Sequence, residues 1–77
     1  MNEFRELDVL VSRKVMGIEV NFDHEIGEYI EIFSKSVVPF YSTDKEAARA
    51  VLKKVTGRDG EVTNPLLLVR EVLDLYI

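Results

Sequence analysis

The sequence predicts a small α+β fold, in which three helices pack on a two- or three-stranded antiparallel sheet in the order α-β-β-α-α. Three observations predict this sandwich-like arrangement: helical apolar spacing near the N-terminus, strand-like alternation after it, and two well-marked helix starts in the second half. The 77 residues are expected to form one domain, residues 1–77, with a small core. The chain contains no cysteine, so oligomerisation is the remaining common source of extra stability.

The first helix is predicted between Asn2, which can cap it, and Gly17, which can end it. Acidic residues fall in its first turn and basic residues near its end, as the helix dipole favours. Its core-facing stripe recurs at helical spacing and consists of Phe4, Leu7, Leu10, Val11 and Val15.

A β-hairpin is predicted after the first helix, with its arms at residues 18–22 and 28–33. The first arm alternates apolar and polar side chains, and the second is rich in β-branched and aromatic ones. The second arm would also fit a helical stripe, but Gly27 interrupts that helix and favours the strand. A short run at Val37 and Val38 can extend the sheet.

The second helix is the most clearly marked element of the chain. Thr43 and Glu46 have the spacing of a capping box, and Gly57 fits a left-handed C-cap. Phe40 and Tyr41 are expected to pack beneath the start of this helix. The helix face that is expected to point toward the core consists of Ala47, Ala48, Val51, Leu52 and Val55.

The third helix is predicted to begin at Asn64, an N-cap residue, followed by Pro65, whose missing N–H is harmless at the first position. Its apolar residues cover more than a single stripe, and a chain this short has little other protein to cover them. We therefore expect the protein to self-associate at this helix, through Leu67, Leu68, Leu75 and Tyr76.

The charge balance of 14 acidic and ten basic residues gives a formal net charge of −4. This balance is typical of a soluble protein and argues against broad electrostatic binding to nucleic acid. No apolar stretch is long enough to cross a bilayer, so we expect a cytoplasmic protein with no membrane association.

The sequence shows no catalytic motif. Asp23, His24 and Glu25 can be interpreted as metal ligands or as a solvated turn, and the turn is preferred because consecutive side chains point in different directions. The serines and threonines have no evident base beside them, and residues 57–60 lack the lysine of a phosphate-binding loop. We expect no cofactor, no metal and no enzymatic activity.

Two charged surfaces are candidate binding sites. The basic face of the second helix can contact phosphates or be merely solvated, and it consists of Lys45, Arg49 and Lys53. The acidic surface of the hairpin can engage a basic protein or merely discourage edge-to-edge aggregation. It consists of Glu19, Asp23, Glu25, Glu28 and Glu31.

Two strings of the sequence are distinctive, LVSRKVMG from Leu10 to Gly17 and PFYSTDKEAA from Pro39 to Ala48. The first resembles the LVAEKVMG helix end, and the second the P-x-YSTD-x-x-AA helix entry, of the phage ABA sandwich domain family of small phage and prophage proteins. Ile18 stands where the family usually has tryptophan. The resemblance implies a sandwich fold and a phage or prophage setting, and it brings no catalytic residues.

These observations favour a non-catalytic protein–protein interaction module that self-associates and binds a host or phage protein. The first alternative is a nucleic-acid-associated accessory protein that uses the basic helix face. The second alternative is a small enzyme, which has the least support because no nucleophile, base and metal are seen to converge.

Overall fold

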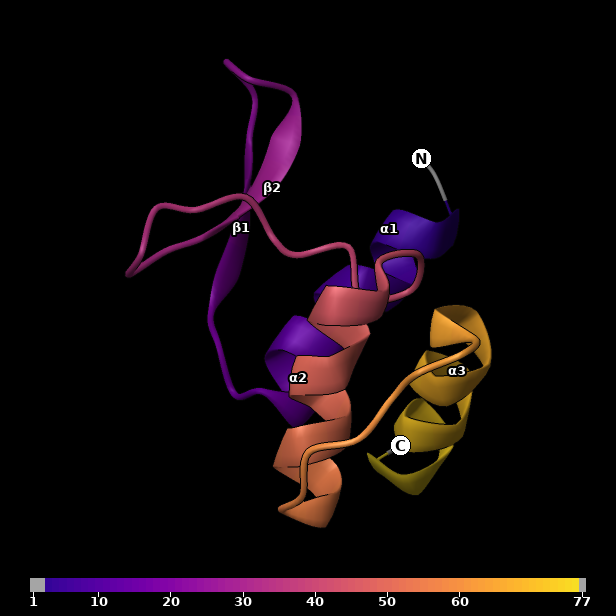
Figure 1. The fold of residues 1–77 in the computed structure, drawn as a ribbon. Coiled ribbons are helices and arrows are strands. Elements are labelled where there is room, and N and C mark those ends of the chain that lie inside the picture. The colour runs from indigo at the N-terminus through magenta and orange to yellow at the C-terminus, as the bar shows by residue number, and fades with distance from the viewer. Residues whose placement is uncertain (1–2, 77) are drawn as a thin grey trace.

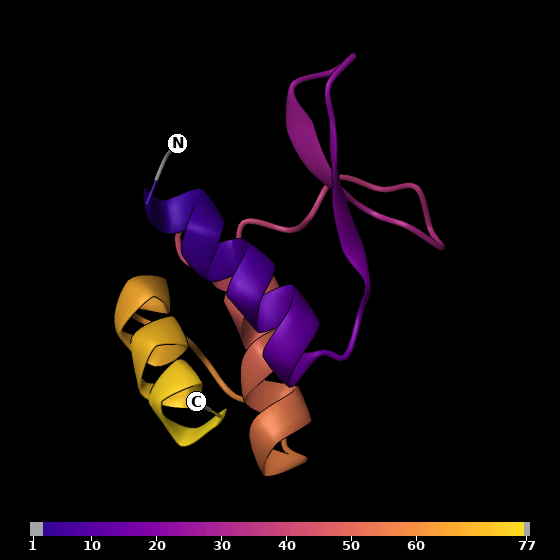
Figure 2. The ribbon, with the colours of Figure 1, turned by 180° about the vertical axis from the view of Figure 1, so that it is seen from behind.

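The computed structural model, which describes residues 3–76, has three helices and a two-stranded antiparallel sheet and confirms the predicted α+β class. The elements are α1 (Glu3–Leu10) with its π-helical continuation η1 (Val11–Val15), β1 (Val20–Asp23), β2 (Glu28–Glu31), α2 (Lys45–Thr56) and α3 (Pro65–Tyr76). The helices cluster together and the hairpin extends from them on one side (Figure 1, Figure 2). No helix within residues 3–76 is long and apolar enough to span a membrane.

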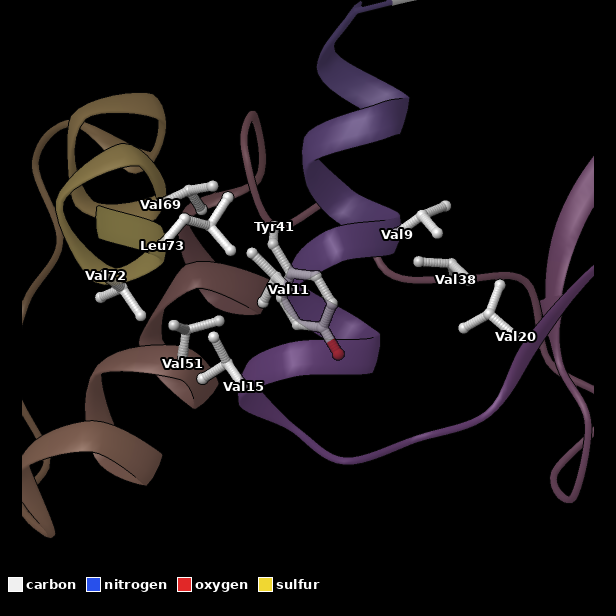
Figure 3. Packing of buried hydrophobic residues seen from close by; sticks show 10 residues of the cluster. All are labelled: Val9, Val11, Val15, Val20, Val38, Tyr41, Val51, Val69, Val72 and Leu73. Carbon is white, nitrogen blue, oxygen red and sulfur yellow. The ribbon is translucent and has the colours of Figure 1, made fainter. Parts of the chain in front are cut away.

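The first helix is central, because the hairpin packs on one of its sides and the other two helices pack on another. Val9 faces Val20 and Val38 on the hairpin side (Figure 3). On the opposite side the core is formed by Val11, Val15, Val51, Val69, Val72 and Leu73. Nine of the twelve buried hydrophobic residues within the described chain are valines. The core is therefore built from small, branched side chains.

The buried surface of the first helix is wider than the predicted apolar stripe. Val11 and Val15 are buried as expected, whereas Phe4 is exposed. The predicted cap at Asn2 lies outside the described residues. The buried set also contains three polar residues that an apolar pattern does not indicate, namely Arg5, Asp8 and Ser12.

The first helix ends in a π-turn. The Met16 N–H donates to the Val11 carbonyl, five residues back, at 3.0 Å. Gly17 then adopts the left-handed conformation with φ of 69°, as predicted for the residue that ends this helix. The Ile18 N–H donates to the Ser12 carbonyl at 2.8 Å, which directs the chain toward β1.

The hairpin is confirmed, with Val20 opposite Glu31, although both strands are shorter than the predicted arms. Residues 32–36 form a second turn, closed by a hydrogen bond of 2.8 Å from the Glu31 N–H to the Ser36 carbonyl. Val37 then forms an isolated bridge with Ile30, so the predicted extension of the sheet amounts to one bridge.

The register gives the hairpin two different faces, because side chains alternate along each strand. The inner face, toward α1, carries Val20 and Tyr29, with Val38 beside them. The outer face carries Ile30 and, beyond the strand end, Ile32, together with Val37 on the returning segment. Ile32 and Val37 are exposed, so the outer face carries an uncovered apolar patch beside polar residues such as Asn21, the partner of Ile30.

The predicted capping box at the start of α2 is wrong by one residue. The N-cap is Asp44, whose Oδ1 accepts a hydrogen bond from the Glu46 N–H at 2.9 Å. Thr43 is part of a turn, and its own N–H donates to the Phe40 carbonyl at 3.1 Å. Asp44 has the extended conformation that an N-cap requires, with φ of −102° and ψ of 120°.

The other helix boundaries agree with the sequence signals. Gly57 is the left-handed C-cap of α2, with φ of 75°. Asn64 caps α3, since its Oδ1 accepts from the Leu67 N–H at 3.1 Å. Tyr41 is buried beneath the start of α2, whereas Phe40 is exposed, so that packing prediction holds for the tyrosine only.

Replacing Asp44 by alanine should lower the free energy of unfolding by about 1 kcal/mol, because the Glu46 N–H loses its acceptor. The matched control is Thr43→Ala, which leaves this acceptor in place. Urea unfolding followed by circular dichroism measures both. A larger loss in the threonine variant would contradict the observed cap.

Candidate functional site

A buried polar network joins α1 to the hairpin and to the segment that enters α2. Its centre is Arg5, a residue of α1 that is only 8% exposed. The guanidinium donates to the carboxylates of Asp8, at 2.7 Å, and of Glu28, at 3.0 and 3.3 Å. It also donates to the carbonyl oxygens of Val38, at 2.9 Å, and of Pro39, at 3.4 Å. These five contacts match the five N–H groups of an arginine.

The side chains of Arg5 and Glu28 take the place of one backbone hydrogen bond between β2 and the returning segment. In a continued antiparallel ladder the Tyr29 N–H would donate to the Val38 carbonyl. Instead, this N–H donates to Glu28 Oε1 at 3.0 Å, and the carbonyl accepts from Arg5. The side-chain pair therefore ties the last residues of the sheet directly to α1.

The pKa of Glu28 lies below its ordinary value of 4.5. The main cause is the hydrogen bond from the Tyr29 N–H, and the bond and charge of Arg5 act in the same direction, against the opposing effect of burial. A lowered pKa means that the ionised carboxylate stabilises the fold above pH 4.5, and this contribution is lost as the pH falls further.

Asp8 and Ser42 close the network at the entry to α2. Asp8 is fully buried, and its Oδ1 accepts from the Ser42 N–H at 2.8 Å. The Ser42 hydroxyl donates to the Phe4 carbonyl at 3.2 Å. The ring of Phe40 lies 4.0 Å from the Arg5 guanidinium, in a cation–π arrangement.

A second polar contact runs between η1 and β2. The Ser12 hydroxyl donates to Glu31 Oε2 at 3.3 Å. Nearby, burial raises the pKa of Tyr41 to about 12, and the negative charges of Glu31 and Asp8 add to this effect, while the hydrogen bond with Ser12 opposes it. Tyr41 is therefore a neutral phenol over the physiological range.

The buried network is suited to holding the fold together. Within residues 3–76, every buried side-chain nitrogen and oxygen has a hydrogen-bond partner. Its hydroxyls, Ser12 and Ser42, are buried away from solvent, where a substrate could not reach them. A functional site would therefore lie on the surface of the molecule.

The residues considered as metal ligands form the turn of the hairpin. Asp23 Oδ1 accepts from the backbone N–H groups of Glu25 and Ile26, at 2.9 and 3.3 Å. The His24 ring meets the edge of Phe22, with centroids 4.9 Å apart. In the part of the chain that the structure describes, no three His, Cys, Asp or Glu side chains gather into a metal site.

Fewer residues of the acidic surface are available to a partner than the sequence predicts. Three of its five residues serve the fold: Asp23 holds the hairpin turn, Glu28 binds Arg5, and Glu31 accepts from Ser12. The other two, Glu19 and Glu25, are exposed near opposite ends of the hairpin.

The predicted basic face is exposed along α2 and consists of Lys45, Arg49 and Lys53. Acidic side chains lie beside it: Arg49 is 3.5 Å from Glu46, and Lys53 is 3.8 Å from Asp59. Glu61 lines the same shallow hollow as Lys45 and Arg49. These carboxylates lower the positive potential that a phosphate backbone would need.

The residues predicted for self-association lie on or near the outside of α3. Leu67 is 53% exposed and Leu75 is 77% exposed, and Tyr76 is exposed as well. Leu68 is half-buried against the core. A shallow hollow of about 190 Å³ lies between α2 and α3, where Leu67 and Leu68 meet Leu52.

An exposed apolar surface on the hairpin was missed by the sequence reasoning. Phe33 is 86% exposed at the 32–36 turn, next to Ile32. Phe33 lines a hollow of about 430 Å³ that also includes Ile18, Glu19 and Glu31. The signal was present as an apolar pair directly after β2, but the prediction placed this pair inside the strand.

Replacing Arg5 by alanine should lower the free energy of unfolding by about 3 kcal/mol or more, because Asp8 is left buried without its cation. The control is Arg70→Ala, which removes an exposed pair with Glu3 at 3.6 Å and should cost no more than about 1 kcal/mol. Arg5→Lys, which keeps the charge but not the five N–H groups, is the milder variant if the alanine variant does not fold. Similar losses for Arg5→Ala and Arg70→Ala in urea unfolding would contradict the role given to the network.

Tyr41 should make the fold sensitive to alkaline pH. Its raised pKa means that the neutral phenol is preferred in the fold, so its stabilisation is complete below pH 10 and is lost between pH 10 and about 12. Compared with Tyr41→Phe, the wild type should lose up to about 1.4 kcal/mol per pH unit in this window. Tyr76→Phe is the exposed control. If the free energy of unfolding of the wild type and of Tyr41→Phe changed with pH in the same way, the raised pKa of Tyr41 would be contradicted.

No model of a known protein family matches the chain, and no curated protein or solved structure matches it either. The resemblance to the phage ABA sandwich domain family therefore rests on the two sequence strings and stays a prediction.

Proposed function

We propose that this chain is a non-catalytic protein–protein interaction module that self-associates, of the small phage or prophage type that its sequence resembles. The observation that carries the proposal is the uncovered apolar patch on the outer face of the hairpin. The solvent side of an antiparallel sheet is ordinarily polar, and here it carries Ile32 and Val37 with Phe33 beside them. An exposed aromatic next to aliphatic side chains is typical of the centre of a protein interface.

The outer side of α3 supports self-association. Leu67 and Leu75 lie two turns apart, with Glu71 between them, on a side of the helix that points away from the core. Exposed leucines of this kind mark interaction surfaces in small soluble proteins when they are grouped. The hollow beside Leu67 gives this surface a shape that a protruding side chain can fill.

Nucleic-acid binding is less well supported. The basic face of α2 is flanked by Glu46, Asp59 and Glu61, and the chain as a whole is acidic. Phosphate binding depends on a dense positive array, which these carboxylates interrupt. An enzyme is also less well supported, because the buried hydroxyls and carboxylates are committed to the internal network.

Sedimentation velocity over a micromolar concentration series tests the self-association. The wild type should sediment as an oligomer at high micromolar concentration. Leu67→Ser combined with Leu75→Ser should weaken association by about tenfold or more, because two exposed anchors are removed without loss of core packing. Glu6→Ser is the control, since Glu6 is exposed on α1, outside α3 and the hairpin. A strictly monomeric wild type would contradict the proposed self-association.

A further inference from the structure

The charge of the protein is unevenly distributed along the chain. Residues 18–38, which contain the hairpin, have five acidic residues and one basic residue, so this region alone sums to −4. Residues 45–58, which contain α2 and its C-terminal turn, have five basic residues and one acidic residue. The rest of the chain sums to −4, most of it in residues 59–77, which have four acidic residues and one basic residue. The molecule therefore has a negative arm and a positive helix.

These two regions do not meet within one molecule. Figure 1 and Figure 2 show α2 running away from the hairpin, and Figure 3 shows α1 between them. The ion pairs of the basic face, with Glu46 and Asp59, are solvent-exposed and contribute little, so they are readily exchanged. A carboxylate from another molecule can therefore compete for Arg49 and Lys53.

The apolar features of the two regions are complementary as well. Phe33 protrudes from the hairpin at its 32–36 turn, and the α2–α3 hollow has Leu52 and Leu67 in its lining. The hollow also has Glu61 and Glu71 in its lining, and Lys35 follows Phe33 by two residues. The turn thus offers an aromatic ring and a cation where the hollow offers leucines and carboxylates.

The basic face of α2 and the acidic side of the hairpin are similar in length. Lys45 and Lys53 are eight residues apart on α2, a span of about 12 Å at the helical rise. Glu19 and Asp23 are four strand residues apart, a span of about 13 Å. The two spans are similar, so carboxylates along the hairpin can lie beside the amines along α2.

We infer that the hairpin of one copy docks on the α2–α3 side of a second copy. Phe33 enters the hollow that contains Leu52, Leu67 and Leu68, and the hairpin acids Glu19 and Glu25 face the basic face of α2. This inference rests on the proposed self-association and assigns its surfaces. Pairing two hairpins with each other is disfavoured, because it would bring like charges together.

Such a contact is heterologous, since each copy uses a different surface on each side. It leaves one unused hairpin and one unused α2 face at the ends of any open assembly, so association continues into a ring or a chain. Because exposed charges contribute to it, the contact should weaken as salt is raised.

Two charge-reversed variants test the contact by sedimentation velocity at low salt. The hairpin variant carries Glu19→Lys and Glu25→Lys, and the helix variant carries Lys45→Glu and Lys53→Glu. All four positions are exposed, so the fold should be retained, which circular dichroism checks. Each variant alone should associate at least tenfold more weakly than the wild type. An equal mixture of the two should restore association, because each variant supplies the charge that the other lacks.

The control variant, Glu6→Lys with Asp74→Lys, makes the same charge change as the hairpin variant, at exposed positions outside both surfaces, and should associate like the wild type. If the wild type associates and the hairpin and helix variants do so equally well, the inferred contact is overturned and self-association elsewhere, such as α3 to α3, stands. Weakened variants that a mixture does not restore also overturn it.

A wild type that stays monomeric overturns both the inferred contact and the proposed self-association. In that case a peptide of alternating lysine and leucine serves as a probe, with binding followed by NMR of the labelled protein. Shifts at Glu19 and Phe33 would assign the hairpin surface to a basic partner protein instead of a second copy.

Discussion

The fold depends on one guanidinium group. Arg5 is the only described side chain that contacts α1, the hairpin and the segment entering α2 through hydrogen bonds at the same time. The hairpin brings few apolar residues to the core, so the valine contacts around Val9 and Val38 would hold it weakly by themselves. A buried arginine with all of its N–H groups satisfied fixes the orientation of its partners as well as stabilising the contact. This is because the planar guanidinium donates hydrogen bonds only in fixed directions. The position of the hairpin is therefore set by polar geometry.

Local signals in the sequence were sufficient for most of the fold. Gly57, Asn64 and Pro65 act within a single helix turn, and they end or begin helices where they were expected to. Local signals could not decide whether Thr43 or Asp44 is the N-cap, because the answer depends on how the preceding turn packs. Threonine and aspartate are both favoured N-cap residues, and tertiary packing decides between neighbours of these types.

The site was harder to predict than the fold, because it depends on partners far apart in sequence. Arg5, Asp8 and Ser12 recur at core-facing helical spacing, which is a usable sign of a buried polar stripe. Their partners, such as Glu28 and Ser42, lie more than twenty residues away and carry no local mark. The acidic hairpin was recognised as a group, but only the register and contacts separate the residues that hold the fold from those left for a partner.

The predominance of valine in the core has a consequence for how the protein folds. A β-branched side chain has little rotamer freedom to lose on burial, so a valine core forms at a low cost in side-chain entropy. The same branching lowers the helix propensity of the segments that carry these valines, and helices this short are marginal in isolation. Each helix is therefore stable mainly because the others are docked on it. Secondary structure and tertiary packing should then appear together, in one cooperative step, and excised segments should be largely unstructured.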